Sequence, residues 1–143
     1  MTTLEATQVL VFSGALAILV SSLLGFAMLI PLQPWGRKLT KDMNFKQIGS
    51  AHLDWIMLGL MQALAGGLIF LFDLSPAIWV VWAMVAGGWL NPLPYVFRAF
   101  GVNAFVFDGG LVQRAASALG GLSSTLIVVS WIVLISTAWS KWP

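Results

Sequence analysis

A single imidazole is the group in this sequence most able to do chemistry. His52 is the only histidine, and it stands in an otherwise apolar stretch that carries one other ionisable side chain, Asp54. A neutral imidazole can bind a metal or a haem iron through a free ring nitrogen, or it can form a hydrogen bond that joins two helices. The residues alone leave both interpretations open.

A second group of polar side chains follows about forty residues later. Asn91, Tyr95 and Arg98 are spaced by four and three residues, so on a helix they project from one side. Pro92 and Pro94 interrupt the same turn and free backbone carbonyl groups. Such backbone is tolerated at membrane depth only inside protein or beside a polar cavity. We therefore expect a kinked helix that directs an amide, a phenol and a guanidinium to one place, with a packing kink and a snorkelling Arg98 as the alternative.

Two further polar residues lie near the histidine. Asp54 is two positions after His52, so on a helix it points about 200° away and cannot share its face. We expect Asp54 to face the headgroup region or to pair with Lys46 or Arg114. Gln62 lies deeper, where an interhelical hydrogen bond is the expected role.

The composition shows that these groups must sit in helices surrounded by lipid. Hydrophobic residues make up 59% of the chain and charged residues 8%, whereas soluble proteins carry about a quarter charged residues. An ordinary soluble domain and a disordered chain are both excluded. The chain has no Cys, which excludes disulfides, thiolate zinc sites, iron–sulfur clusters and covalently attached haem.

Four stretches are long and apolar enough to cross the bilayer, which takes about 20 residues. They cover about 7–32, 47–72, 76–100 and 111–139. Small residues recur every four positions along three of them, which is typical of helices in close contact. The sequence thus predicts an all-α fold, an integral membrane four-helix bundle forming a single transmembrane domain over 1–143. The apolar residues of the loop 101–110 further indicate that this loop folds back onto the protein or the membrane.

The basic residues predict the orientation of the bundle. Six of the seven Lys and Arg residues fall near the first and third loops. By the positive-inside rule these loops are cytoplasmic, so both termini lie on the non-cytoplasmic side of the cytoplasmic (inner) membrane. The pI of about 9.4 comes from these residues, and we interpret it as a topology signal with no nucleic-acid partner.

Two motifs carry a family resemblance. The run Ser50-Ala51-His52-Leu53-Asp54, with Gly59 seven residues after the histidine, resembles the Ala-His motif of small four-helix membrane isomerases, which include styrene oxide isomerase and hydroxylaminobenzene mutase. A second run is similar to the Gly-Trp-x-Asn, Tyr-x-Phe-x-x-Phe and Asn pattern of styrene oxide isomerase in order and spacing. Its residues are Gly88-Trp89-Leu90-Asn91, Tyr95-Val96-Phe97, Phe100-Gly101 and Asn103.

The resemblance implies a definite chemistry. Styrene oxide isomerases are trimers that carry haem b, with iron bound by the histidine that matches His52. Residues matching Asn91 and Tyr95 lie around the reacting oxygen or support its pocket. Ferric iron with an open position is a Lewis acid that can rearrange an epoxide to an aldehyde or ketone. Hydroxylaminobenzene mutase moves oxygen from nitrogen to the ring in a related way.

The expected site combines the resemblance with the residues above. His52 is the metal ligand, Asn91 and Tyr95 are the catalytic residues, and the haem is further contacted by Trp55, Gly59, Trp89 and Arg98. The substrate is a small hydrophobic epoxide or arylhydroxylamine, and the oligomer implied is a homotrimer. Two positions depart from the family pattern: Leu58 replaces an Asn and Gly87 replaces an Asp. Leu58 cannot hydrogen-bond a substrate oxygen, and Gln62, one turn further on, is the candidate substitute.

Other functions remain open at this stage. An arylhydroxylamine mutase of the same superfamily would use the same residues. A small transporter would use the interrupted third helix to line a path, and would not need His52 as a metal ligand. A non-catalytic haem-binding scaffold is favoured by Leu58.

Overall fold

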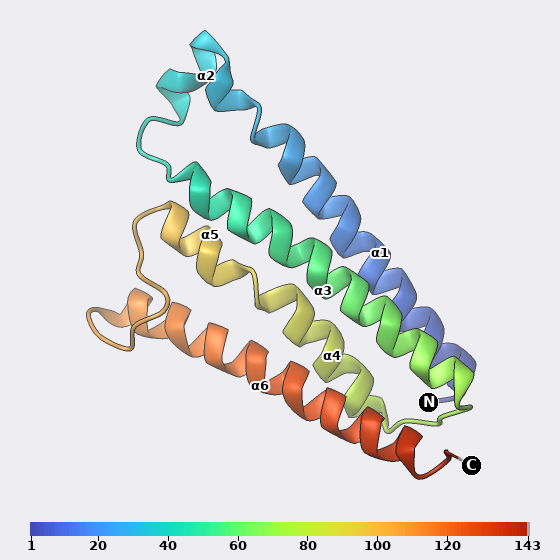
Figure 1. The fold of residues 1–143 in the computed structure, drawn as a ribbon. Helices are drawn as coiled ribbons and strands as arrows, with labels where there is room; N and C mark the ends of the chain where they lie inside the picture. The colour runs from blue at the N-terminus through green and yellow to red at the C-terminus, as the bar shows by residue number, and fades with distance from the viewer. Residues whose placement is uncertain (143) are drawn as a thin grey trace.

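The chain folds into four long helical segments that run side by side (Figure 1). The computed structural model describes residues 1–142, and every regular element within this range is a helix. The segments are α1 (Thr3–Ala27), α3 (Phe45–Leu71), α4 (Ile78–Leu90) with α5 (Leu93–Ala99), and α6 (Leu111–Trp139). The prediction of four helices long and apolar enough to cross a membrane is confirmed.

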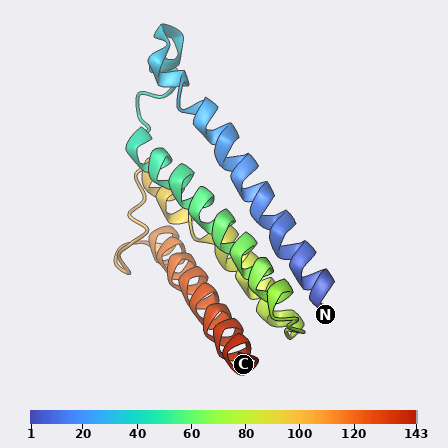
Figure 2. The same cartoon turned by 45° about the vertical axis from the view of Figure 1, so that its right-hand side comes forward.

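The first helix begins at Thr3, four residues earlier than the expected boundary at 7, because Thr2 and Glu5 form a capping box. The Thr2 hydroxyl accepts from the Glu5 amide at 3.2 Å, and the Thr2 amide donates to the Glu5 carboxylate at 2.9 Å. The two bonds satisfy amide groups that a helix start otherwise leaves free. After α1 the chain forms a short 3-10 turn, η1 (Ile30–Leu32), and the helix α2 (Pro34–Leu39), which stands beyond the end of the bundle (Figure 2).

The third segment is broken where the two prolines predict a break. Helix α4 ends at Leu90 and α5 begins at Leu93, so the expected span 76–100 consists of two helices instead of one. The proline at position 92 has no amide hydrogen, and its ring does not fit against the preceding turn. The break places Asn91 at the C-terminal end of α4 and Tyr95 on α5.

The helices form two close pairs. Helix α1 packs mainly on α3, and α6 packs mainly on α4. In the first pair, a Cβ added at Gly59 would lie 2.7 Å from the Gly14 carbonyl oxygen. In the second pair, the Ser130 hydroxyl donates to the Val80 carbonyl at 3.1 Å. Small and hydroxyl side chains thus allow the backbones to approach, as the four-residue spacing predicts.

Both termini lie at the same end of the bundle, next to the turn between α3 and α4 (Figure 1). Asp73 of this turn accepts a hydrogen bond from the Thr3 hydroxyl at 2.9 Å, and its backbone carbonyl accepts one from the Lys141 ammonium group. Asp73 has a positive φ of 46°, a conformation that Asp tolerates better than most residues. Helix α2 and the loop 101–110 lie at the opposite end.

Candidate functional site: a free imidazole nitrogen and a polar cavity

His52 is held by helix α1 through one ring nitrogen. Its Nδ1 atom lies 2.8 Å from the backbone carbonyl oxygen of Ser21 and 2.8 Å from the Ser21 hydroxyl. The same hydroxyl donates to the His52 carbonyl at 2.6 Å. Because a carbonyl oxygen only accepts, Nδ1 carries the proton in the neutral ring. Nε2 is therefore the basic nitrogen, and it has no hydrogen-bond partner among residues 1–142.

A free imidazole nitrogen held in this way has the donor chemistry that binding a metal requires. Metal-bound histidines usually donate their other ring N–H to a carbonyl or carboxylate, which fixes the tautomer and the ring orientation. Gly25 of α1 lies under the ring, because a Cβ there would come 3.3 Å from Cε1. Within residues 1–142, no three His, Cys, Asp or Glu side chains gather to hold a bare metal ion. A metal bound at His52 would therefore need ligands other than these side chains.

Asn91 is the centre of a polar network that joins three helices. Its Nδ2 donates to Asp54 of α3 at 3.1 Å, and its Oδ1 accepts from Ser123 and Ser124 of α6, both at 3.0 Å. Asp54 thus pairs with an amide, and the expected partners Lys46 and Arg114 are wrong. Asn91 lies at the break between α4 and α5, and its amide takes the position at Asp54 that a cation was expected to occupy.

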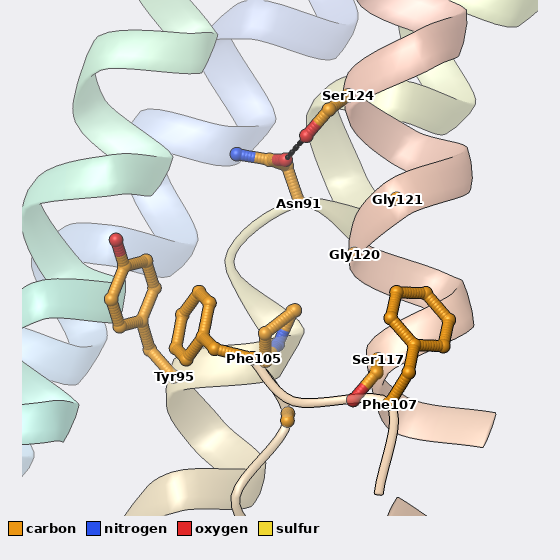
Figure 3. Close-up of a pocket in the computed structure, with 10 residues that line it drawn as sticks. Asn91, Tyr95, Phe105, Phe107, Ser117, Gly120, Gly121 and Ser124 are labelled. Atoms are coloured by element: carbon orange, nitrogen blue, oxygen red, sulfur yellow. Dashed lines mark hydrogen bonds between the residues drawn. The ribbon is translucent and has the colours of Figure 1, made fainter. Parts of the chain in front are cut away.

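A cavity of about 320 Å³ lies beside this network, between α5, α6 and the loop 101–110 (Figure 3). Asn91 and Ser124 are its polar lining residues, and Tyr95, Phe105 and Phe107 contribute aromatic rings. The backbone of α6 forms one side of the cavity at Gly120, Gly121 and Ser124. Ser124 is exposed at the surface of the chain. The cavity therefore opens to the side of the bundle.

Tyr95 and Arg98 both contact the loop residue Phe105. The Tyr95 and Phe105 ring centroids are 5.1 Å apart, and the Arg98 guanidinium carbon lies 5.2 Å from the Phe105 centroid. These contacts confirm that the loop folds back onto the protein. In Figure 3 the Tyr95 hydroxyl points away from Phe105 and bonds none of the other residues drawn. The Tyr95 ring therefore lines the cavity, while its hydroxyl is directed to the other side, towards α3.

Trp55, Trp89 and Gly59, the other residues expected to contact haem, lie at contacts between helices. Trp55 is buried with Ala51 of α3 and Ala17 of α1, and Trp89 packs against this cluster. The Trp89 indole donates to the Ser13 hydroxyl at 2.9 Å. Gly59 lies at the close contact with Gly14 described above.

Within a single copy of the chain, His52 and Asn91 do not lie together. His52 bonds Ser21 of α1, whereas Asn91 bonds Asp54, which points about 200° away from His52 around α3. The free imidazole nitrogen and the polar cavity therefore form two separate groups on different sides of α3.

Sequence reasoning missed several residues of these groups. Ser21 and Ser124 belong to the small residues that recur every four positions, and Ser123 has no predicted role, yet the hydroxyls of all three bond His52 or Asn91. A serine within an uncharged span is a usable signal, because its hydroxyl needs a partner in lipid. The interhelical hydrogen bond expected for Gln62 is wrong. Its side chain is buried against Gly88, and neither amide atom has a partner within the described range.

Comparison with known proteins finds no matching family model, no matching curated protein and no matching solved structure.

Proposed function

We propose that the protein is a haem-dependent membrane isomerase that rearranges a small hydrophobic epoxide to an aldehyde or ketone. The observation that carries the proposal is the arrangement of His52, whose Nδ1 is bound to Ser21 while Nε2 is left free. The resemblance at the two motifs supports the same function. An arylhydroxylamine mutase would use the same ligand and the same cavity.

The haem would supply a ferric Lewis acid with one open position, able to polarise a carbon–oxygen bond. His52 would bind it through Nε2, and the Ser21 carbonyl would hold the imidazole in the required tautomer and orientation. The absence of Cys leaves no thiolate to compete for the open position.

Asn91 and Tyr95 would position the substrate oxygen. Asn91 Nδ2 carries two hydrogens, of which one is donated to Asp54. The second hydrogen and the Tyr95 hydroxyl are used by no other hydrogen bond within residues 1–142, and they would be available to a substrate oxygen. Phe105 and Phe107 would keep water away from the reacting bond, which strengthens both hydrogen bonds.

We further propose that the active site is completed between copies of the chain. Within one copy, His52 and the cavity lie on different sides of α3, and the cavity opens sideways. A head-to-tail contact would place the His52 side of one copy against the cavity of the next, and such contacts form a ring when the rotation between copies closes. A homotrimer is the ring that the resemblance implies. The basic loops would face the cytoplasm, with both termini outside the inner membrane.

A haem-binding scaffold without catalysis is the second candidate. The observation that favours it is the same separation of His52 from Asn91 in one chain. A scaffold would bind haem and leave epoxides and arylhydroxylamines unchanged.

Absorption spectroscopy tests the proposal directly. The protein, expressed with haem supplied and purified in detergent, is expected to show a Soret band that His52→Ala abolishes or strongly shifts. Ser50→Ala is the matched control, because its hydroxyl bonds only the Lys46 carbonyl of its own helix. A colourless, folded wild type would overturn the proposal. Haem binding without conversion of styrene oxide or an arylhydroxylamine would select the scaffold.

A further inference from the structure

A short segment between α1 and α3 stands outside the bundle. It consists of η1, α2 and the turn that follows, residues 30–43, and we call it the hook. Figure 2 shows the hook at the end of α1, beyond the ends of the other long helices. Helix α1 has 25 residues, so it is about 38 Å long, whereas the hydrocarbon core of a bilayer is about 30 Å thick. A spanning helix of this length reaches the headgroup region, which brings the hook next to lipid headgroups.

The hook is folded closely on itself. Gly36 is the buried residue of α2, and a Cβ there would collide with the Ile30 carbonyl oxygen and come 2.9 Å from the Ile30 Cγ2 atom. At the end of α2 the Thr40 hydroxyl donates to the Gly36 carbonyl at 2.9 Å. A loop that only supplies positive charge for orientation needs no such packing. The packing of α2 on η1 therefore indicates that the side chains of the hook are held in a fixed arrangement.

The outer surface of the hook is apolar on one side and basic on the other. Trp35 is 58% exposed and Leu39 is 73% exposed, and their spacing of four residues places them on one side of α2. Arg37, two positions after Trp35, points about 200° away from it around the helix. Lys38 and Lys41 are exposed as well. Exposed apolar and basic sides on one short helix are typical of a segment that lies at the lipid–water interface.

The charge of this region favours an anionic partner. Four of its residues are basic, and Asp42 is the only acidic residue from 30 to 46. Lys and Arg side chains donate hydrogen bonds to phosphate oxygens. Each cation near an anionic membrane surface raises the affinity by about fivefold. A zwitterionic phospholipid carries the same phosphate but no net charge, so it lacks this attraction.

We propose that the hook binds the headgroups of anionic phospholipids in the membrane that the bundle spans. Trp35 and Leu39 insert at the level of the headgroups, and Arg37, Lys38 and Lys41 contact the phosphates. Only two residues, 28 and 29, separate α1 from η1, so the surface within reach of the hook is that of the same membrane. The inference is independent of haem, of isomerase activity and of which leaflet the hook meets.

A spin label at position 39 tests the inference. The chain has no Cys, so Leu39→Cys provides a single site for a nitroxide on the apolar side of α2. The full chain is reconstituted in vesicles of phosphatidylcholine alone or of phosphatidylcholine mixed with phosphatidylglycerol. The ratio of collision rates with oxygen and with a neutral nickel chelate reports how far the label lies in lipid. This ratio is expected to be at least about threefold higher in the anionic vesicles, and salt at about 1 M should reduce the difference.

Four variants, each carrying the label, separate charge from folding. Arg37→Gln combined with Lys38→Gln and Lys41→Gln is expected to abolish the difference between the two vesicle types. Lys141→Gln, at the opposite end of the bundle, is the control and should keep it.

Gly36→Ala leaves every charge in place but separates α2 from η1, and it is expected to lose most of the difference. Thr40→Val removes only the hydroxyl bond to Gly36 and should cause a smaller loss. Because it alters the hook less, it replaces Gly36→Ala if that protein does not fold.

Each outcome decides the inference. A difference that is lost in the triple variant and reduced in Gly36→Ala, but kept in Lys141→Gln, supports it. Equal ratios in the two vesicle types overturn it, and a label exposed to water in both would indicate an acidic protein partner instead. A difference that survives in the triple variant overturns the role of the cations. One that is unchanged in Gly36→Ala and Thr40→Val overturns the role of the folded hook.

Discussion

The backbone carbonyl oxygen of Ser21 lies 2.8 Å from Nδ1 of His52, so helix α1 determines which imidazole nitrogen is free. The Ser21 hydroxyl adds a reciprocal bond to the His52 carbonyl at 2.6 Å. Helices α1 and α3 are thus joined at the residue that the proposed function assigns to iron. The contact between Ser21 and His52 therefore fixes both the orientation of the imidazole ring and the packing of α1 on α3.

Removing the Ser21 hydroxyl is expected to weaken haem binding. Ser21→Ala keeps the backbone carbonyl but lets the ring tilt, and we expect an affinity loss of about tenfold, at the lower end of the effects of such supporting contacts. Haem titration followed at the Soret band measures it. Ser22→Ala is the control, because that hydroxyl donates to Ile18 of its own helix. Equal affinities for the two variants would contradict the assigned role of Ser21.

The contact between Gly14 and Gly59 is expected to limit substitution. Gly59→Ala would bring a Cβ to 2.7 Å from the Gly14 carbonyl oxygen, and separating the helices should reduce the free energy of unfolding by about 1–3 kcal/mol. Unfolding of the detergent-solubilised protein by SDS measures the change. Gly67→Ala, in open space on the same helix, should leave stability nearly unchanged. A fully stable Gly59→Ala protein would show that α1 and α3 are further apart.

The network around Asn91 is expected to tolerate only a conservative change at position 54. Asp54→Ala leaves the Asn91 amide without its acceptor, and a buried polar group without a partner costs about 1–3 kcal/mol. Asp54→Asn keeps an oxygen in place and should recover most of this stability and the epoxide conversion. Thermal unfolding and the rate of conversion are both measured. If Asp54→Ala and Asp54→Asn behave alike, Asp54 does not position Asn91.

Complementation tests whether the active site forms between copies. His52→Ala and Tyr95→Phe should each be inactive alone, since one lacks the ligand and the other lacks the hydroxyl. Co-expressed, they should regain part of the wild-type activity, because mixed rings contain contacts with an intact His52 on one copy and an intact Tyr95 on the next. Mixed oligomers are purified with two different affinity tags. Mixed oligomers without activity would place both residues of a working site in one chain.

The absence of cysteine makes the orientation directly testable. Lys38→Cys, on helix α2, and Ser75→Cys, in the turn between α3 and α4, lie at opposite ends of the bundle. By the positive-inside rule, an impermeant thiol reagent added to intact cells should label position 75 and leave position 38 unlabelled. Labelling of position 38 alone would reverse the proposed topology.

The helices and the break were predictable from the sequence, because both follow from local properties. An uncharged stretch of sufficient length is enough to predict a spanning helix. A proline without an amide hydrogen interrupts a helix wherever it stands, and Pro92 does so here. The start of α1 at Thr3 lies before the uncharged stretch, and the Thr2–Glu5 capping pair is the local signal that predicts it.

The partners of the polar residues were not predictable in the same way. Spacing along α3 places His52 and Asp54 on different faces, but it does not say which helix each face meets. Which helix each face meets depends on how α1 and α6 pack. Without that packing, an interhelical serine cannot be distinguished from a small residue that only allows close approach. The loop 101–110 was expected to fold back, whereas the contact of Phe105 with Tyr95 depends on the path of the loop after Gly101.

The placement of both chain ends beside Asp73 has a practical consequence. Since α1 begins and α6 finishes at one end of the bundle, a flexible polar tether can join consecutive copies without an additional membrane crossing. Tandem fusions of two or three copies would then have a defined order and stoichiometry. A single altered copy could be introduced at a chosen position, so that the contribution of each subunit to an assembly could be counted.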